Sequence, residues 1–128
     1  MQDLRPTIEA AWDNRDLLKE SSTQQAIRAL VSALDSGELR VAEPTSNGWQ
    51  VNEWVKKAVV LYFPIHEMET LEVPPFEFHD NIPLKTGYAA TGVRVVPPAI
   101  ATHGACLSSV VIMLSSYGTI CASVVLPL

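Results

Sequence analysis

Arg94 is the side chain in this sequence whose type and setting best suit the binding of an anionic ligand. It lies in segment 92–98, GVRVVPP, where the valines indicate a short extended stretch that the two prolines end. A planar guanidinium can hold both oxygens of a carboxylate at once. Taken from the residues alone, however, an arginine on a short strand is more typical of a solvated surface ion pair.

The histidines and cysteines do not follow the pattern of a metal site. His66, His79 and His103 are far apart and pair with no cysteine or carboxylate at a ligand spacing, so each is interpreted as an ordinary surface or turn residue. Cys106 and Cys121 are too few for a disulfide framework, which predicts two reduced, buried thiols. We therefore predict no metal ligand in this chain.

Two further groups of side chains could bind a ligand. An acidic run is usually a solvated face and only occasionally a cation site. Its members are Glu67, Glu69, Glu72 and Glu77. Trp12, Trp49 and Trp54 could form an aromatic cage, but two of them fall on apolar faces of predicted helices, which favours core packing.

The charge balance excludes some classes of partner. The chain has 9 basic and 14 acidic residues and a formal charge of -5, so it offers no basic field to a phosphate backbone, and we expect no nucleic acid partner. The first ten residues lack the basic and apolar segments of a secretory signal, which favours a cytoplasmic protein. No charged side chain follows Arg94, and this asymmetry predicts two structural regimes.

Two helices are predicted at the amino terminus. Asp3 is placed to cap the first, whose apolar stripe is narrow. Ser22 and Gln25 form a capping-box pattern before the second, which has apolar residues at i, i+3, i+4 and i+7. Gly37 supplies the end of that helix.

A hairpin and a third helix are predicted next. Residues 39–43 and 49–51 have the character of two strands joined by an Asn47-Gly48 turn. The third helix follows Asn52 and is apolar around much of its circumference, although a strand is a competing interpretation for residues 58–63.

The prolines divide the chain. They interrupt every candidate element after the third helix, so residues 64–98 are predicted to be a proline-rich extended connector with local turns. This gives a helical amino-terminal domain at 1–63, the connector at 64–98 and a tail at 99–128.

The uncharged tail leaves three interpretations open. It is long enough to cross a membrane as a helix, but its serines and the lack of flanking basic residues weaken that interpretation. Steps of six from Cys106 reach Ile112, Gly118 and Val124, a spacing found in parallel β-helices, in which Gly118 would leave a gap in the interior. The tail could instead be a buried strand or an aggregation-prone segment.

Four segments carry a resemblance to a known family. They are 33–43 (ALDSGELRVAE), 49–61 (W at 49 and WVKKAVVL at 54–61), 82–85 (IPLK) and 92–98 (GVRVVPP). In order and spacing they resemble the amino-terminal region of the tetrahydrodipicolinate N-succinyltransferases. The resemblance is close to residue 99 and weaker, without gaps, from there to the end.

The resemblance implies a fold and an activity. The fold is α+β: a helical amino-terminal domain with a short hairpin, then the first coils of a left-handed parallel β-helix of hexapeptide repeats, in a homotrimer or other homo-oligomer. The activity is that of an acyl-CoA-dependent N-succinyltransferase of lysine and diaminopimelate synthesis, with a dicarboxylate substrate, succinyl-CoA as co-substrate and no permanently bound cofactor. In such enzymes the acceptor amine attacks the thioester carbonyl and a carboxylate accepts a proton.

The resemblance also implies site residues. It makes Arg94 a ligand of a substrate carboxylate and supplies no catalytic residue, because the presumed catalytic aspartate would fall beyond Leu128. The chain is therefore expected to be inactive alone. It departs from the family at Ser115, where proline is usual, and at residues 125–126, where acidic residues are typical. The alternative function is a non-catalytic assembly or binding module that uses the apolar tail as an interface.

Overall fold

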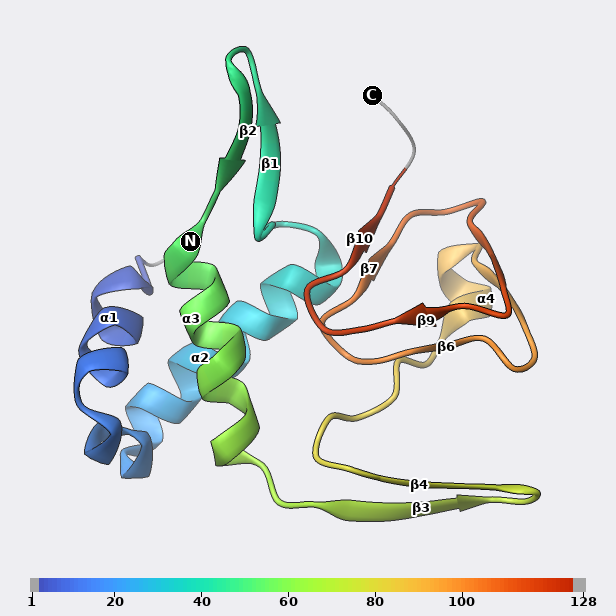
Figure 1. Cartoon of the computed structure of the whole chain (residues 1–128), viewed down its shortest axis with the longest axis horizontal. Helices are drawn as coiled ribbons and strands as arrows, with labels where there is room; N and C mark the ends of the chain where they lie inside the picture. The colour runs from blue at the N-terminus through green and yellow to red at the C-terminus, as the bar shows by residue number, and fades with distance from the viewer. Residues whose placement is uncertain (1–2, 126–128) are drawn as a thin grey trace.

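Three helices pack together in the first half of the chain (Figure 1). The computed structural model describes residues 3–125. The helices are α1 (Arg5–Asp13), α2 (Ser21–Ser36) and α3 (Glu53–Tyr62), and 3-10 turns η1 (Arg15–Lys19) and η2 (Phe63–Ile65) follow α1 and α3. Residues 58–63 thus continue the helical part of the chain, and the competing strand interpretation is wrong.

The helix ends agree only in part with the capping patterns. The Asp3 carboxylate accepts the backbone N–H of Arg5 at 3.1 Å, as a cap would, although the N-cap position itself is Leu4. Asn52 occupies the N-cap position of α3, but its side chain donates instead to the carbonyl of Arg40 at 2.9 Å. Asn52 therefore fixes the base of the preceding hairpin rather than the helix.

The capping box predicted for α2 is wrong. The N-cap position is Glu20, two residues before Ser22, and the helix begins at Ser21. The Gln25 amide donates to the Ser21 hydroxyl at 3.3 Å instead of reaching back to a backbone N–H. Its carboxyl end is as predicted. Gly37 adopts a left-handed conformation (φ 82°) and donates its N–H to the carbonyl of Leu34, which is the usual way for a helix to stop at glycine.

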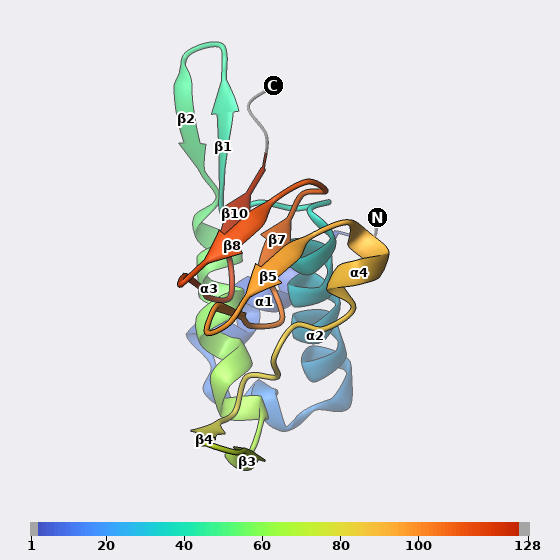
Figure 2. The same ribbon diagram turned by 90° about the vertical axis from the view of Figure 1, so that its right-hand side faces the viewer.

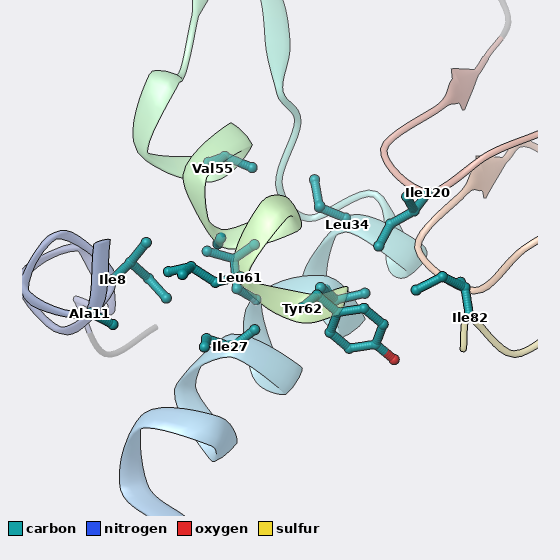
Figure 3. Close-up of a cluster of buried hydrophobic side chains, with 12 residues drawn as sticks. Ile8, Ala11, Ile27, Leu34, Val55, Leu61, Tyr62, Ile82 and Ile120 are labelled. Atoms are coloured by element: carbon teal, nitrogen blue, oxygen red, sulfur yellow. The ribbon is translucent and has the colours of Figure 1, made fainter. Parts of the chain in front are cut away.

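The larger hydrophobic core lies among the three helices, and two residues from later parts of the chain complete it. Figure 3 shows Ile82 and Ile120, which come from later parts of the chain, approaching Leu34 and Tyr62. The other buried members are Ile8, Ala11, Ile27, Leu30, Val31, Val55, Ala58 and Leu61. Fully burying an aliphatic side chain contributes about 1.5–3 kcal/mol. The helices and the later strands consequently stabilise each other through one shared core.

Two antiparallel hairpins extend from the body (Figure 1). β1 (Ala42–Thr45) and β2 (Gly48–Val51) form the predicted hairpin. Its first strand lies later than the predicted 39–43, and its turn is at residues 46–47 instead of Asn47-Gly48, because Gly48 pairs with Thr45. β3 (Glu69–Val73) and β4 (Phe76–Asp80) form a second, in a segment predicted to hold no regular element. The prediction failed because two of the prolines, at 74 and 75, occupy the turn itself, where proline is favoured, and do not interrupt a strand.

The rest of the chain forms three short strands and then three more, which pair in parallel with the first three. After the short α4 (Tyr88–Thr91) come β5 (Arg94–Val96), β6 (Ile100–Ala101), β7 (Cys106–Leu107), β8 (Ile112–Leu114), β9 (Tyr117–Gly118) and β10 (Ser123–Val124). β8, β9 and β10 pair in parallel with β5, β6 and β7 respectively, and the β5–β8 pair faces the viewer in Figure 2. We call residues 94–124 the coil.

The coil replaces the membrane helix considered for the tail. Partners across the parallel pairs are 17 or 18 positions apart, since Arg94 lies opposite Ile112 and Ile100 opposite Tyr117. Within the described residues, no helix has the length and apolar character needed to cross a bilayer.

The spacing of six is present in the coil, but in a different phase. Val95, Ala101, Leu107 and Met113 recur at steps of six and pack in a second hydrophobic core. Cys106 and Ile112, one residue earlier in each step, lie out of phase, and 55% of Ile112 is exposed. We call β5–β7 the first pass of the coil and β8–β10 the second pass. Val95 lies opposite Met113, 18 positions later, but Ala101 lies opposite Gly118, 17 positions later, so the second pass is one residue shorter than the first.

The gap at Gly118 is about the size of a methyl group. A Cβ there would lie 3.4 Å from the Cβ of Ala101 and 3.7 Å from the Cε of Met113, which is ordinary van der Waals contact. The flexible thioether of methionine suits it to filling irregular space. Ala101 and Met113 therefore fill most of the space that a larger aliphatic residue would occupy.

Left-handed residues turn the corners of the coil. Gly92 (φ 70°) and Gly104 (φ 90°) turn the first pass, and Val110 (φ 65°) and Cys121 (φ 71°) donate their N–H groups to those glycines' carbonyls at 3.0 Å. Ser115 (φ 44°) turns a further corner of the second pass. A non-glycine residue in the left-handed conformation costs about 1–3 kcal/mol. The backbone of the second pass is therefore strained at these three corners, and the packing of the coil must offset the cost.

Candidate functional site

Arg94 lies on β5 with its side chain exposed. Its backbone N–H donates to the carbonyl of Val111 at 2.9 Å, and the residue pairs with Ile112 of β8. Because side chains alternate along a strand, Val95 and Met113 face the interior and Arg94 faces outward. The turn before it is fixed by Val93, which is buried and donates its N–H to Tyr88 at 3.0 Å.

The residues that the strand register places beside Arg94 on the outer face of the strand pair are apolar. Ile112 lies directly opposite, and Val96 and Leu114 follow on the same face by the two-residue alternation. No carboxylate of residues 3–125 lies within 4.0 Å of the Arg94 guanidinium, so the surface ion pair expected from the residues alone is not formed with this part of the chain. This arrangement suits an anionic group supplied by another molecule.

Two hollows in the described part of the chain do not include Arg94 in their lining. One, of about 720 Å³, lies between α1, η1 and the start of α2. The other, of about 800 Å³, lies between the β3–β4 hairpin and the coil.

The three histidines lie apart and each contacts its own neighbour. The ring Nδ1 of His66 lies 3.0 Å from the carbonyl of Tyr62, and that of His79 lies 2.8 Å from the hydroxyl of Thr70. His103 Nδ1 lies 3.4 Å from an Asp35 oxygen. Across residues 3–125, no three His, Cys, Asp or Glu side chains gather as a metal ion would require.

The tryptophans do not form a cage. Trp12 and Trp54 pack against the helical core, as predicted, and Trp12 lies beneath the guanidinium of Arg15 at 4.7 Å from the ring centroid. Trp49, on β2, is 74% exposed, so core packing does not extend to it.

Both cysteines are free, and each is half-buried rather than fully buried as predicted. Burial raises the pKa of the Cys121 thiol above its ordinary value. It also raises the pKa of the Tyr62 hydroxyl, an effect that Arg28 opposes and Asp35 reinforces. Neither group lies beside Arg94 in the strand register.

One polar cluster could not be found by spacing. The Asp35 carboxylate, at the end of α2, accepts the backbone N–H of Gly104 at 2.8 Å and lies 2.7 Å from the ammonium of Lys85. These partners are 69 and 50 positions away along the chain, and only the packing of the coil on the helix brings them together. The cluster positions the coil relative to the helices.

The comparison with known proteins bears on this arrangement. A family model described as the amino-terminal part of tetrahydrodipicolinate N-succinyltransferase matches residues 3–65, which hold the three helices and the first hairpin. The chain belongs to this family. It corresponds to an amino-terminal portion of the succinyltransferases.

Relatives in the family match almost the whole chain. A 2,3,4,5-tetrahydropyridine-2,6-dicarboxylate N-succinyltransferase of Bordetella petrii is 41% identical over 125 residues, covering 90% of this chain and 46% of the relative. The protein of that name from Alkalilimnicola ehrlichii is 45% identical over 115 residues, covering 82% of this chain and 42% of the relative. The chain thus spans less than half the length of these relatives.

Proposed function

We propose that this chain forms the acceptor-binding part of an acyl-CoA-dependent N-succinyltransferase of lysine and diaminopimelate synthesis. The observation that carries the proposal is Arg94, exposed on an apolar strand face with no carboxylate of residues 3–125 within 4.0 Å. The family match and the names of the relatives support the reaction class.

The fold proposed for the carboxy-terminal part is the beginning of a left-handed parallel β-helix of hexapeptide repeats. Three short parallel pairs, offsets of 17 or 18 positions and interior residues at steps of six support it. The proposed domains remain 1–63, 64–98 and 99–128, with 1–2 and 126–128 outside the described residues. Because β5 already pairs within the coil, the connector overlaps the first strand of the β-helix.

In the proposed reaction Arg94 holds one carboxylate of the acceptor through two parallel N–H···O bonds. The acceptor amine attacks the thioester carbonyl of succinyl-CoA. A C–N bond forms and the C–S bond breaks. The proton lost by the amine passes to a carboxylate and from there to the sulfur, so that coenzyme A leaves as its thiol.

The carboxylate must come from outside the coil. The last acidic residue of the sequence is Asp80, which precedes Arg94, and no charged side chain follows that arginine. We therefore propose that these 128 residues bind the acceptor without turning it over.

The outer face of the coil suggests the assembly that completes the site. Ile112 and Leu114 are 55% and 65% exposed beside Arg94, and Val110, two residues before Ile112, is also exposed. Contiguous exposed apolar side chains are typical of protein interfaces. We propose that this face meets another copy in a trimer, in the cytoplasm. The same face supports the second candidate function, a non-catalytic assembly module.

Calorimetric titration with pimelate, a linear dicarboxylate, tests the binding role. Arg94→Ala is expected to weaken binding at least about tenfold, because a charge-assisted hydrogen bond contributes about 1.5–3 kcal/mol. Arg94→Lys should restore part of the affinity, since it keeps the charge but loses the bidentate geometry. Arg40→Ala, at an arginine outside the coil, is the matched control and should bind as the parent does.

A turnover assay tests the reaction. With succinyl-CoA and tetrahydrodipicolinate, the chain should release no thiol above background. If thiol is released, the requirement for an external carboxylate is wrong. Pimelate binding that Arg94→Ala leaves unchanged would favour the non-catalytic module instead.

A further inference from the structure

The hairpin–coil groove, between the β3–β4 hairpin and the coil, has the dimensions of a small-molecule site. Its volume of about 800 Å³ lies within the range of about 300–1,000 Å³ typical of ligand pockets. Hairpin and coil both line it, and the coil contributes Ile100, Thr102 and Tyr117. A ligand there would contact the β3–β4 hairpin, which the proposed reaction does not use, and coil residues other than Arg94.

Four carboxylates are part of the polar lining. They are Glu67, Glu69, Glu77 and Asp80. No lysine or arginine of residues 3–125 lines the groove, and none of these four forms an ion pair within that range. The groove therefore has a negative potential without an internal counter-charge.

The hairpin register places like charges opposite one another. Glu69 pairs with Asp80, and Glu72 pairs with Glu77. Side chains that face each other across an antiparallel pair lie close together, and like charges in this relation destabilise the hairpin. The two pairs lie on opposite faces of the hairpin, so a cation in the groove would relieve the repulsion between Glu69 and Asp80, which both line it.

Thr102 supplies a second and independent indication of a ligand. It is 3% exposed, and its hydroxyl has no hydrogen-bond partner among the described residues. Two-residue alternation places it on the same outer face as Ile100, away from Ala101, which packs in the interior of the coil. Buried hydroxyl groups nearly always have a partner, so an unpartnered one in the wall of a groove marks a place where a ligand can donate or accept.

The remaining lining is mixed, and its apolar part fits a hydrocarbon body. The apolar members are Leu71, Phe78, Ile82, Pro83, Leu84, Ile100 and the ring of Tyr117, and the polar ones are Thr70, His79, Asn81 and Thr86. A metal ion does not suit this lining, because no three potential ligands of residues 3–125 come together. Dicarboxylates and coenzyme A are anions, which the carboxylates would repel.

We propose that the hairpin–coil groove binds an organic amine with an apolar body. The ammonium group lies among the carboxylates of the hairpin and donates to the Thr102 hydroxyl. The body lies on the apolar wall that Leu84, Ile100 and Tyr117 form. This assignment does not depend on the succinyltransferase reaction.

Amide NMR of the full chain titrated with 2-phenylethylamine tests the proposal. We expect saturable shifts at Thr102, Tyr117 and Phe78. Phenylacetate, which replaces the ammonium with a carboxylate on a similar body, should cause none. The Glu69→Gln/Asp80→Asn double variant should weaken binding about fivefold, since each exposed pair contributes little alone. Glu38→Gln, an exposed carboxylate outside the groove, is the matched control.

Thr102→Val separates the hydroxyl from the shape of the groove, because valine has nearly the same volume. It should weaken the amine about threefold or more while the amide spectrum stays folded. The proposal is overturned if 2-phenylethylamine gives no saturable shifts, if phenylacetate binds as well, or if the double variant binds the amine unchanged. Binding of a lysine-rich peptide in place of the amine would also overturn it.

Discussion

The Asp35 carboxylate accepts the backbone N–H of Gly104 at 2.8 Å, so the last turn of α2 is bound to a corner of the coil 69 positions later. The same carboxylate oxygen lies 2.7 Å from the ammonium of Lys85, whose side chain is largely buried. One side chain thus joins helix, connector and coil.

Asp35→Ala should reduce the free energy of unfolding by about 2 kcal/mol, because it removes a charged acceptor and leaves Lys85 without its partner. Urea denaturation followed by circular dichroism measures the effect. Asp13→Ala, at an exposed position, should change stability by under about 0.5 kcal/mol. Equal losses in the two variants would show that Asp35 has no special role.

Gly104→Ala should be strongly destabilising. A Cβ there would lie 2.7 Å from Ile120 Cγ1 and 3.1 Å from Val31 Cγ1, and the backbone has φ 90°. Left-handed strain and overpacking each cost roughly 1–3 kcal/mol. Gly87→Ala separates the two costs, since Gly87 has φ 76° but open space around it. Thermal unfolding should give a clearly larger loss for Gly104→Ala than for Gly87→Ala.

Val110→Gly should stabilise the chain by about 1 kcal/mol. Val110 is exposed and has φ 65°, a conformation that β-branched residues rarely adopt and glycine adopts without strain. Val60→Gly, at an exposed position in α3, should instead destabilise by about 0.5–1 kcal/mol. If Val110→Gly lowers the melting temperature as Val60→Gly does, the corner is not strained.

Cys121 should react slowly with iodoacetamide near neutral pH. Burial raises the pKa of its thiol, so the reactive thiolate forms only at a higher pH than in an unfolded chain. Unfolding above the ordinary thiol pKa consequently releases a proton, and the contribution of Cys121 to stability is lost as pH rises through the folded pKa. The Cys106→Ser variant isolates this thiol, and its pH–rate profile should shift to lower pH in urea. A profile that is the same with and without urea would contradict the effect of burial.

Ile112→Glu should prevent self-association. The side chain lies on the exposed apolar face beside Arg94, and a buried charge without a partner is costly at an interface. Light scattering should give a mass above the 14.0 kDa of one chain for the parent and the monomer mass for the variant. Val60→Glu, on an exposed face of α3, should leave the assembly intact. A monomeric parent would refute the proposed interface.

Local patterns in the sequence determined the elements whose causes are also local. The three helices, the end of α2 at Gly37 and the presence of the first hairpin follow from apolar spacing and from the backbone preferences of a few residues, although the hairpin turns at residues 46–47 rather than at Asn47-Gly48. The segments that resemble the succinyltransferases also indicated the family before any contact was known.

Tertiary structure decided what depends on distant residues. The phase of the coil follows from which strand pairs with which, and a second pass one residue shorter than the first hides the repeat from a search at a fixed step of six. Packing also produces three contacts between distant parts of the chain. They are the hydrogen bond from Gly104 to Asp35, the position of Ile120 in the helical core, and the carboxylates that line one groove with Thr102. The spacing of residues along the chain does not predict these contacts. They form because burial and strand pairing across the whole fold lower the free energy of this arrangement.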